Sequence, residues 1–172
     1  MRIDDPRAMR ALAHPTRLAL LDHLHAVDHA TATECAVVVG DSPSSCSYHL
    51  RALARWRFVE EAEGGAGRER PWRATASRIE FDSDGVEATV LRDELLARQQ
   101  QRVRDALRRE HELPPRWRRA TQTSSATLEL TPTELETLGE RFEQLLDEFR
   151  GRGDRRGTRP VVVSFGAAAE PR

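Results

Sequence analysis

The chain has 172 residues, of which 38% are hydrophobic and 32% charged, with a formal net charge of −1. That length suits one domain with an appendage or two small domains. No run of about 18 apolar residues occurs, which excludes a membrane span, and two cysteines are too few for a disulfide framework. The start of the chain lacks the apolar core of a signal peptide, so we expect a cytoplasmic protein with no membrane partner.

The charge is unevenly distributed along the chain. Residues 98–119 carry eight arginines against three acids, a net +5, whereas residues 126–150 carry seven acids against two arginines, a net −5. The near-zero total therefore hides a basic and an acidic segment. It also means that the chain lacks the overall basic signature expected of a DNA-binding protein.

The first forty residues carry the start signals of three helices. Asp5 is the expected N-cap of a helix over residues 6–13, and Pro15 begins a second helix that runs to about residue 27. Thr33 is the expected N-cap of a third, short helix, and Gly40 is well placed to end it.

Residues 43–56 predict an amphipathic helix suited to a DNA groove. Ser42 is a good N-cap, and Cys46, Leu50 and Leu53 form an apolar stripe at helical spacing. The rest of the helix carries hydroxyls, a phenol and guanidiniums with no acid, which can donate to phosphates and read base edges. An ordinary surface helix would show a similar pattern. The DNA-binding candidates on this helix are Ser44, Ser45, Ser47, Tyr48, Arg51 and Arg55.

The flanking elements favour the DNA-binding interpretation. Only Gly40 and Asp41 separate the third helix from the next N-cap, which is the helix-turn-helix pattern. Downstream, two short extended runs surround the Gly-rich residues 64–67 and predict a β-hairpin that resembles a wing. Arg68 and Arg70 lie near its tip and are further DNA-binding candidates. Trp72, in the second run, is the expected core anchor beneath the hairpin.

Two motifs within this region are specific when they occur together. Residues 12–21 read Leu-Ala-His-Pro-Thr-Arg-Leu-Ala-Leu-Leu, and residues 47–53 read Ser-Tyr-His-Leu-Arg-Ala-Leu. With the Gly/Arg hairpin, they make residues 8–80 resemble the ArsR-type family of winged helix-turn-helix repressors. The resemblance implies a dimeric bacterial transcription regulator, usually a repressor released by a signal, whose helix at residues 43–56 enters the major groove. It also implies that His49 packs between helices and has no catalytic role.

The remaining sequence predicts a long helix and a small lobe. The helix starts near Asp84, reaches about His111, and carries an apolar side too long to bury on the wing domain, so its expected partner is the same helix of a second chain. The open alternative is that this helix packs on its own C-terminal segment. Residues 126–130 and 160–165 read as strands around a helix that starts at Thr131, a β-α-β lobe.

The expected fold class is therefore α+β, in three parts. Residues 1–80 form a winged helix-turn-helix DNA-binding domain, residues 84–113 a dimerisation helix, and residues 126–165 the C-terminal lobe. We expect the lobe to support the homodimer and to frame a pocket for a small-molecule effector, or to be a stabilising appendage with no ligand.

Metal and cofactor sites are not expected. One metal site of the resembled family uses paired thiolates on the third helix, where this sequence has only Cys35. Another uses carboxylate and His pairs on the dimer helix, where this sequence has only His111. A local zinc alternative is the face shared by Asp22, His25 and His29, and a redox alternative is the pair formed by Cys35 and Cys46.

The residues also give no enzyme signature and no catalytic group, because Ser47 and His49, two apart on a helix, point away from each other. The function predicted is a DNA-binding regulator that acts on double-stranded DNA. Two rivals stay open: a winged helix used only for protein contacts, and a metal- or redox-operated repressor. The charge of the helix face and wing favours DNA, through Arg51, Arg55, Arg68 and Arg70.

Overall fold

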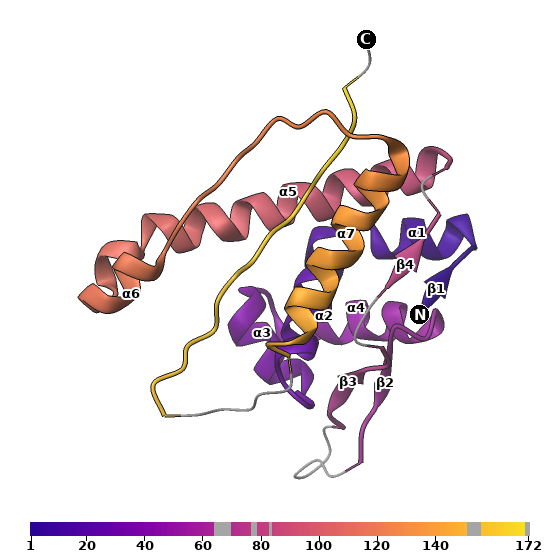
Figure 1. The fold of residues 1–172 in the computed structure, drawn as a ribbon. Coiled ribbons are helices and arrows are strands. Elements are labelled where there is room, and N and C mark those ends of the chain that lie inside the picture. Colours follow the sequence, from indigo (N-terminus) through magenta and orange to yellow (C-terminus); the bar gives the residue numbers. More distant parts are fainter. Residues whose placement is uncertain (64–69, 77–78, 83, 151–155, 171–172) are drawn as a thin grey trace. The chain divides into compact units, whose positions relative to one another are not determined.

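The protein is described here by a computed structural model that covers residues 1–63, 70–76, 79–82, 84–150 and 156–170. The chain divides into two compact units, Met1–Arg98 and Gln99–Arg172. The elements of the first unit run in the order β1 (Arg2–Ile3), α1 (Pro6–Leu12), α2 (Pro15–Ala26), α3 (Ala32–Val39), α4 (Pro43–Arg55), β2 (Val59–Glu61), β3 (Trp72–Ala74), β4 (Glu80–Phe81) and the first part of α5 (Val86–Arg108) (Figure 1).

Helices α1, α2, α3, α4 and α7 begin where a side chain accepts a hydrogen bond from one of their first backbone amides. Asp5 Oδ1 accepts a hydrogen bond of 2.8 Å from the Arg7 amide and so caps α1, as predicted. The prediction for α3 was wrong by two residues, because its N-cap is Thr31 and not Thr33. Thr31 Oγ1 accepts from the Glu34 amide at 3.2 Å, while the Glu34 carboxylate accepts from the Thr31 amide at 2.7 Å. This reciprocal capping box is unavailable to Thr33, which has no acid three residues later.

The turn between α3 and α4 depends on Gly40. Its φ of 75° lies in the left-handed region, where a residue with a Cβ is strained, and its amide bonds to the Ala36 carbonyl. The chain can therefore leave α3 and enter α4 within three residues, 40–42, which confirms the predicted helix-turn-helix pattern.

Two small sheets complete the first unit. Strands β2 and β3 pair antiparallel, with Val59 opposite Ala74, and Ala30 forms an isolated bridge to Trp72. The Gly-rich residues 64–67 and Arg68, predicted at the wing tip, lie outside the described residues. Strands β1 and β4 pair parallel, a contact between distant residues that no local pattern predicts.

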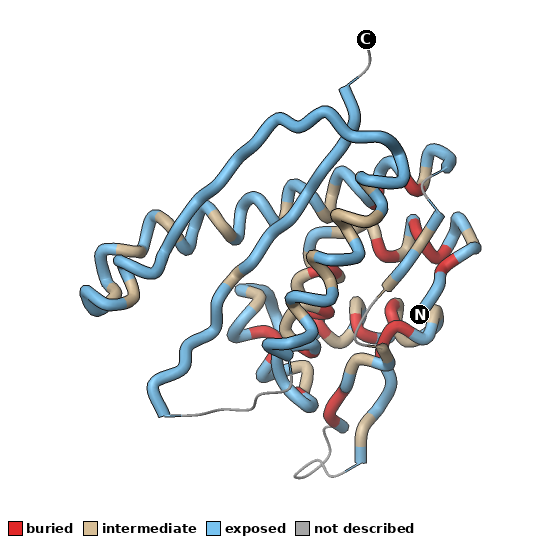
Figure 2. The backbone as a smooth tube through the Cα atoms, viewed as in Figure 1, coloured by how far each residue is buried: buried red, intermediate tan, exposed pale blue. Residues whose placement is uncertain are grey.

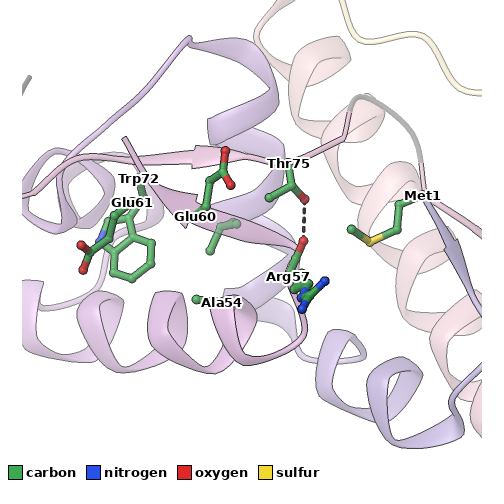
Figure 3. Close-up of a pocket in the computed structure, with 8 residues that line it drawn as sticks. Met1, Ala54, Arg57, Glu60, Glu61, Trp72 and Thr75 are labelled. Atoms are coloured by element: carbon green, nitrogen blue, oxygen red, sulfur yellow. Dashed lines mark hydrogen bonds between the residues drawn. The ribbon is translucent and has the colours of Figure 1, made fainter. Parts of the chain in front are cut away.

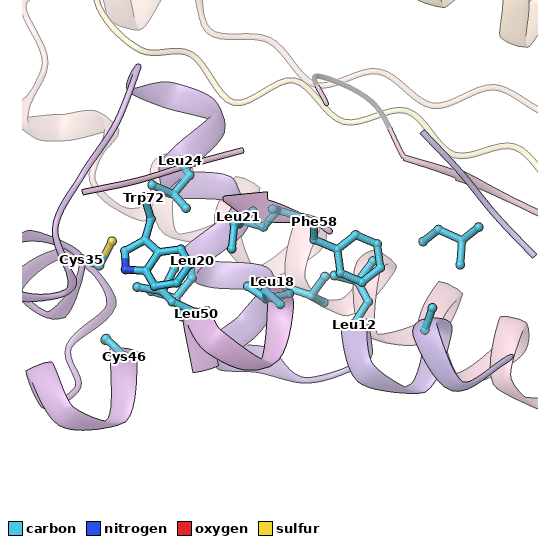
Figure 4. Close-up of a cluster of buried hydrophobic side chains, with 14 of the residues drawn as sticks. Leu12, Leu18, Leu20, Leu21, Leu24, Cys35, Cys46, Leu50, Phe58 and Trp72 are labelled. Carbon is cyan, nitrogen blue, oxygen red and sulfur yellow. The ribbon is translucent and has the colours of Figure 1, made fainter. Parts of the chain in front are cut away.

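One apolar core occupies the first unit. Figure 2 shows buried positions throughout α1 to α4, the wing strands and the start of α5. Trp72 lies among the core leucines, as predicted (Figure 4). Ala88 and Leu91 of α5 are also buried, so the first turns of the long helix belong to this core. The large core side chains are Ile3, Met9, Leu12, Leu18, Leu20, Leu21, Leu24, Leu50, Leu53, Phe58, Trp72 and Leu91.

The second unit contains the rest of α5, a 3₁₀ turn (Glu110–Glu112), α6 (Pro115–Ala120) and α7 (Pro132–Asp147). Helix α7 starts with the capping box of Thr131 and Glu134, as predicted. The strands predicted at residues 126–130 and 160–165 were wrong, because both segments are extended without pairing. Alternating apolar residues form a strand only where a neighbour supplies the ladder of hydrogen bonds. Phe165 instead stacks on Phe142 of α7, with ring centroids 4.5 Å apart.

Candidate nucleic-acid interface

The N-terminus of α4 is fixed by its own polar side chains. Ser42 Oγ accepts from the Ser45 amide at 3.1 Å, and Asp41 accepts from the Ser42 amide and from the Ser45 hydroxyl, both at 2.7 Å. These bonds, the Ser45 hydroxyl first, lower the pKa of Asp41 below its ordinary value. The donor of Ser45, a predicted DNA contact, is thus already occupied within the protein. Ser44 is exposed, and its hydroxyl lies 3.0 Å from that of Ser42.

One side of α4 is anchored in the core. Cys46, Leu50 and Leu53 have no exposed surface, so the stripe predicted from the sequence is confirmed. Helices α2 and α3 both pack against α4. This packing fixes which side of α4 can meet a partner, because the rotation of the helix is set by the three buried side chains.

The other side of α4 is open and carries positive charge. Tyr48 is 69% exposed, and Arg51 and Arg55 are also exposed, while Ser47 is half-buried. Among the described residues, neither Arg51 nor Arg55 forms an ion pair. Their guanidiniums are therefore free to donate to phosphate oxygens or to base edges.

Arg70, just before β3, and Arg73, within it, are arginines of the wing that are already paired. Arg70 lies 2.7 Å from Glu61, and Arg73 lies 2.7 Å from Glu60 across the β2–β3 ladder. All four side chains are substantially exposed, and exposed ion pairs contribute little stability, so either arginine could exchange its glutamate for a phosphate. The structure thus brings Arg70 to the wing, while Arg68 lies outside the described residues.

A cluster of rings and cations lies where α2 meets α4, and the sequence did not reveal it. His14 and His49 contact each other with ring centroids 4.6 Å apart, and the Tyr48 ring meets His49 edge-on at 5.3 Å. His49 therefore packs between helices, as its place in the motif implied. Burial lowers the pKa of Arg17, and the nearby Tyr48 partly offsets this shift by raising the pKa. Both His14 and Arg17 belong to the motif at residues 12–21, so a signal existed, but only the fold shows their contact with α4.

The proposed zinc ligands have separate partners. Asp22 Oδ2 accepts from Arg98 at 2.6 Å, His25 Nε2 lies 2.8 Å from the Ala76 carbonyl, and His29 Nδ1 lies 3.1 Å from Asp28. Within the part of the chain that the structure describes, no three metal-ligating side chains gather in one place.

The two cysteines are buried thiols in the core. Burial, reinforced by neighbouring Cys46, raises the pKa of Cys35 from 9.0 to about 11. Burial likewise raises the pKa of Cys46. Since the thiolate is the reactive form, both thiols are unreactive near neutral pH.

An open cleft of about 630 Å³ lies where the end of α4 meets the wing strands (Figure 3). Thr75 Oγ1 donates to the Arg57 carbonyl at 2.5 Å across this cleft, and Arg57 has a φ of 59°. The carboxylates that line the cleft belong to Glu60 and Glu61, which are already paired with Arg73 and Arg70. The cleft therefore offers no unpaired acidic group to a ligand.

Comparison with known proteins identifies the central part of this unit. The model of a family described as a helix-turn-helix domain matches residues 12–62, which span α2, α3, α4 and strand β2. No curated protein matches the chain. Among the described residues, no helix combines the length and the apolar character needed to cross a membrane. The chain thus contains a helix-turn-helix domain of the kind found in DNA-binding regulators.

Proposed function

We propose that this protein is an ArsR-type, sequence-specific transcription regulator of the cytoplasm that binds double-stranded DNA as a homodimer and represses transcription. The helix-turn-helix domain supports DNA binding. The resemblance of residues 8–80 to ArsR-type repressors supports the family and the sign of regulation.

The observation that carries the proposal is the division of α4 into two sides. Three fully buried side chains anchor one side, and the other side presents Tyr48, Arg51 and Arg55 to solvent. A helix held this way can enter a major groove without moving, because its polar side already faces outward. Arg51, in the middle of that side, is the residue placed to read a guanine, and Arg55 to contact a phosphate.

The homodimer rests on the exposed apolar side of α5. Val86 is 75% exposed and Val90 is 47% exposed, on the side of the helix opposite buried Ala88 and Leu91. Leu96 is a further exposed apolar side chain, at 43%, about a third of a turn around the helix from Val90. Two copies of α5 in contact would cover these residues and place two α4 helices about one DNA turn, roughly 34 Å, apart.

The experiment is a mobility-shift titration of the protein against fragments of its own promoter region and against random DNA of equal length. Preferred binding of one fragment is expected, and the change Arg51→Ala should cost about 1–3 kcal/mol of binding free energy there, as for one base contact. The matched control is Arg141→Ala, which removes an exposed arginine from α7. Equal binding to every fragment, or an equal effect of both variants, refutes the proposal.

The rival function is a winged helix that binds only proteins. The two arginines of α4 without ion pairs favour DNA over it, and the same titration separates the two functions. A small-molecule effector stays a prediction, as does a role of residues 126–165 in holding one.

A further inference from the structure

The junction between α2 and α4 is built from groups whose charge depends on pH. His14, the N-cap of α2, and His49, in the middle of α4, have their ring centroids 4.6 Å apart, with 40° between the ring planes. Arg17 Nε and His49 Nδ1 are buried and form no hydrogen bond with any other described residue. Beside the buried apolar anchors of α4, this junction therefore adds a contact made by two imidazoles next to a guanidinium.

His14 can cap α2 only in its neutral form. Its Nδ1 accepts a hydrogen bond of 3.2 Å from the Thr16 amide and so caps α2. A protonated imidazole carries hydrogen on both nitrogens and can accept no hydrogen bond. Protonation of His14 therefore removes the cap and adds a positive charge next to His49 at the same time.

The titratable and charged groups around the pair come from α2, α4, α5 and the turn before α4. Arg17 of α2 opposes protonation of both histidines, while Glu94 of α5 favours it at His14 and Asp41, before α4, favours it at His49. Tyr48 of α4 contacts the His49 ring and adds no charge near neutral pH. The balance is against the charged forms. Burial first, and then Arg17, lower the pKa of His14 from its ordinary value, and burial, then His14, then Arg17 lower the pKa of His49.

We propose that His14 and His49 form an acid-sensitive switch that releases DNA when the pair is protonated. Two adjacent imidazolium rings beside Arg17 repel one another, the cap of α2 is lost, and α4 leaves the position set by α2. The use of this switch in DNA binding rests on the proposed function above.

The direction of the effect follows from the lowered pKa values. The contact contributes its full stability above about pH 6.5, where histidines of the unfolded chain are neutral too. As the pH falls below that value, the unfolded chain takes up protons first, and the stability is lost as the pH passes through the lowered values of the folded state. Ordinary surface histidines act in the opposite direction, because their protonation adds positive charge and strengthens DNA binding.

The test measures DNA affinity and the melting temperature of the free protein from about pH 8 to about pH 5.5, the range in which histidine titrates. Acidification should weaken DNA binding by the wild-type protein several-fold, because protonation of the pair breaks the contact between α2 and α4. The double variant His14→Asn, His49→Gln keeps a capping side chain and removes both titrations, so it should lose most of this dependence. The control His111→Gln removes an exposed histidine from the second unit and should behave as the wild type does.

The outcomes separate the switch from the proposed function. The switch is overturned if DNA binding seen at about pH 8 is unchanged or stronger on acidification. It is also overturned if the double variant loses DNA affinity on acidification as the wild type does. Either result leaves the proposed function standing. If no fragment binds at any pH, the function fails and the melting temperature decides. In that case the wild type must lose more thermal stability on acidification than the double variant, and equal losses overturn the switch.

Discussion

Arg98 Nε donates to Asp22 Oδ2 over 2.6 Å and so ties the long helix α5 to α2 within the first unit. Both side chains are mostly buried, at 28% and 33% exposed. Helix α2 in turn contacts α4, so the position of α5 and that of the candidate recognition helix are linked through packed elements. If two α5 helices form the dimer contact, this ion pair lies on the path between that contact and DNA.

A double-mutant cycle of Asp22→Ala and Arg98→Ala should give a coupling energy on the order of 1 kcal/mol in urea unfolding, because the pair is sheltered from water. The comparison pair is Arg109 and Glu112, which lie 2.9 Å apart at 74% and 48% exposure. Their coupling should be smaller. Equal coupling in the two pairs would show that burial adds nothing to the contact between α2 and α5.

The change Leu50→Ala should destabilise the protein by about 2–5 kcal/mol, because it leaves a cavity in the core at a fully buried position of α4. Leu145→Ala in α7 is the matched control, since that leucine is 50% exposed. Urea unfolding measures both. A cost of Leu50→Ala no larger than that of Leu145→Ala would contradict the description of the core.

Val90→Glu should dissociate the proposed homodimer, because it places a charge in the middle of the exposed apolar side of α5. Sedimentation equilibrium of the variant should show a shift from dimer toward monomer at equal protein concentration. Leu128→Glu, at an exposed leucine outside α5, serves as the control and should leave the mass unchanged. A wild-type protein that is monomeric at all concentrations would remove the basis of the proposed dimer.

The Cys35 thiol should make stability fall at alkaline pH. Its pKa is raised from 9.0 to about 11, so the folded protein keeps it protonated at pH values where the unfolded chain has lost the proton. This contribution to the free energy of unfolding is complete below pH 9.0 and is lost as the pH rises through about 11. Unfolding curves of wild type and Cys35→Ala over this range measure it. A wild-type curve with the same alkaline slope as the variant's would disprove the shift.

The elements that were predicted correctly are those that local chemistry determines. Asp5, Ser42 and Thr131 begin helices because their oxygens meet amides within the next three residues, and Gly40 ends one because its backbone must be left-handed. The apolar stripe of α4 follows from helical periodicity alone. The prediction of Thr33 as N-cap was avoidable, because Glu34, the acid that makes Thr31 the better cap, is present in the sequence.

The missed features depend on distant residues. Pairing of Arg2 with Glu80 cannot be seen in two short segments, and residues 126–130 alternate like a strand without a neighbour to pair with. At the interface, the sequence identified the open side of α4. It could not show that Asp41 binds Ser45 or that His14 reaches His49, because both contacts require the turn and the packing of α2 on α4.

The core described above also implies an uneven tolerance to amino-acid change. Among the described residues, every buried side chain precedes Arg98, so most random substitutions beyond it disturb no packed neighbour. The earlier part of the chain can therefore diverge only slowly between descendants of this gene. The later part is free to drift, or to be exchanged for another sequence, as far as the folding of the single chain is concerned.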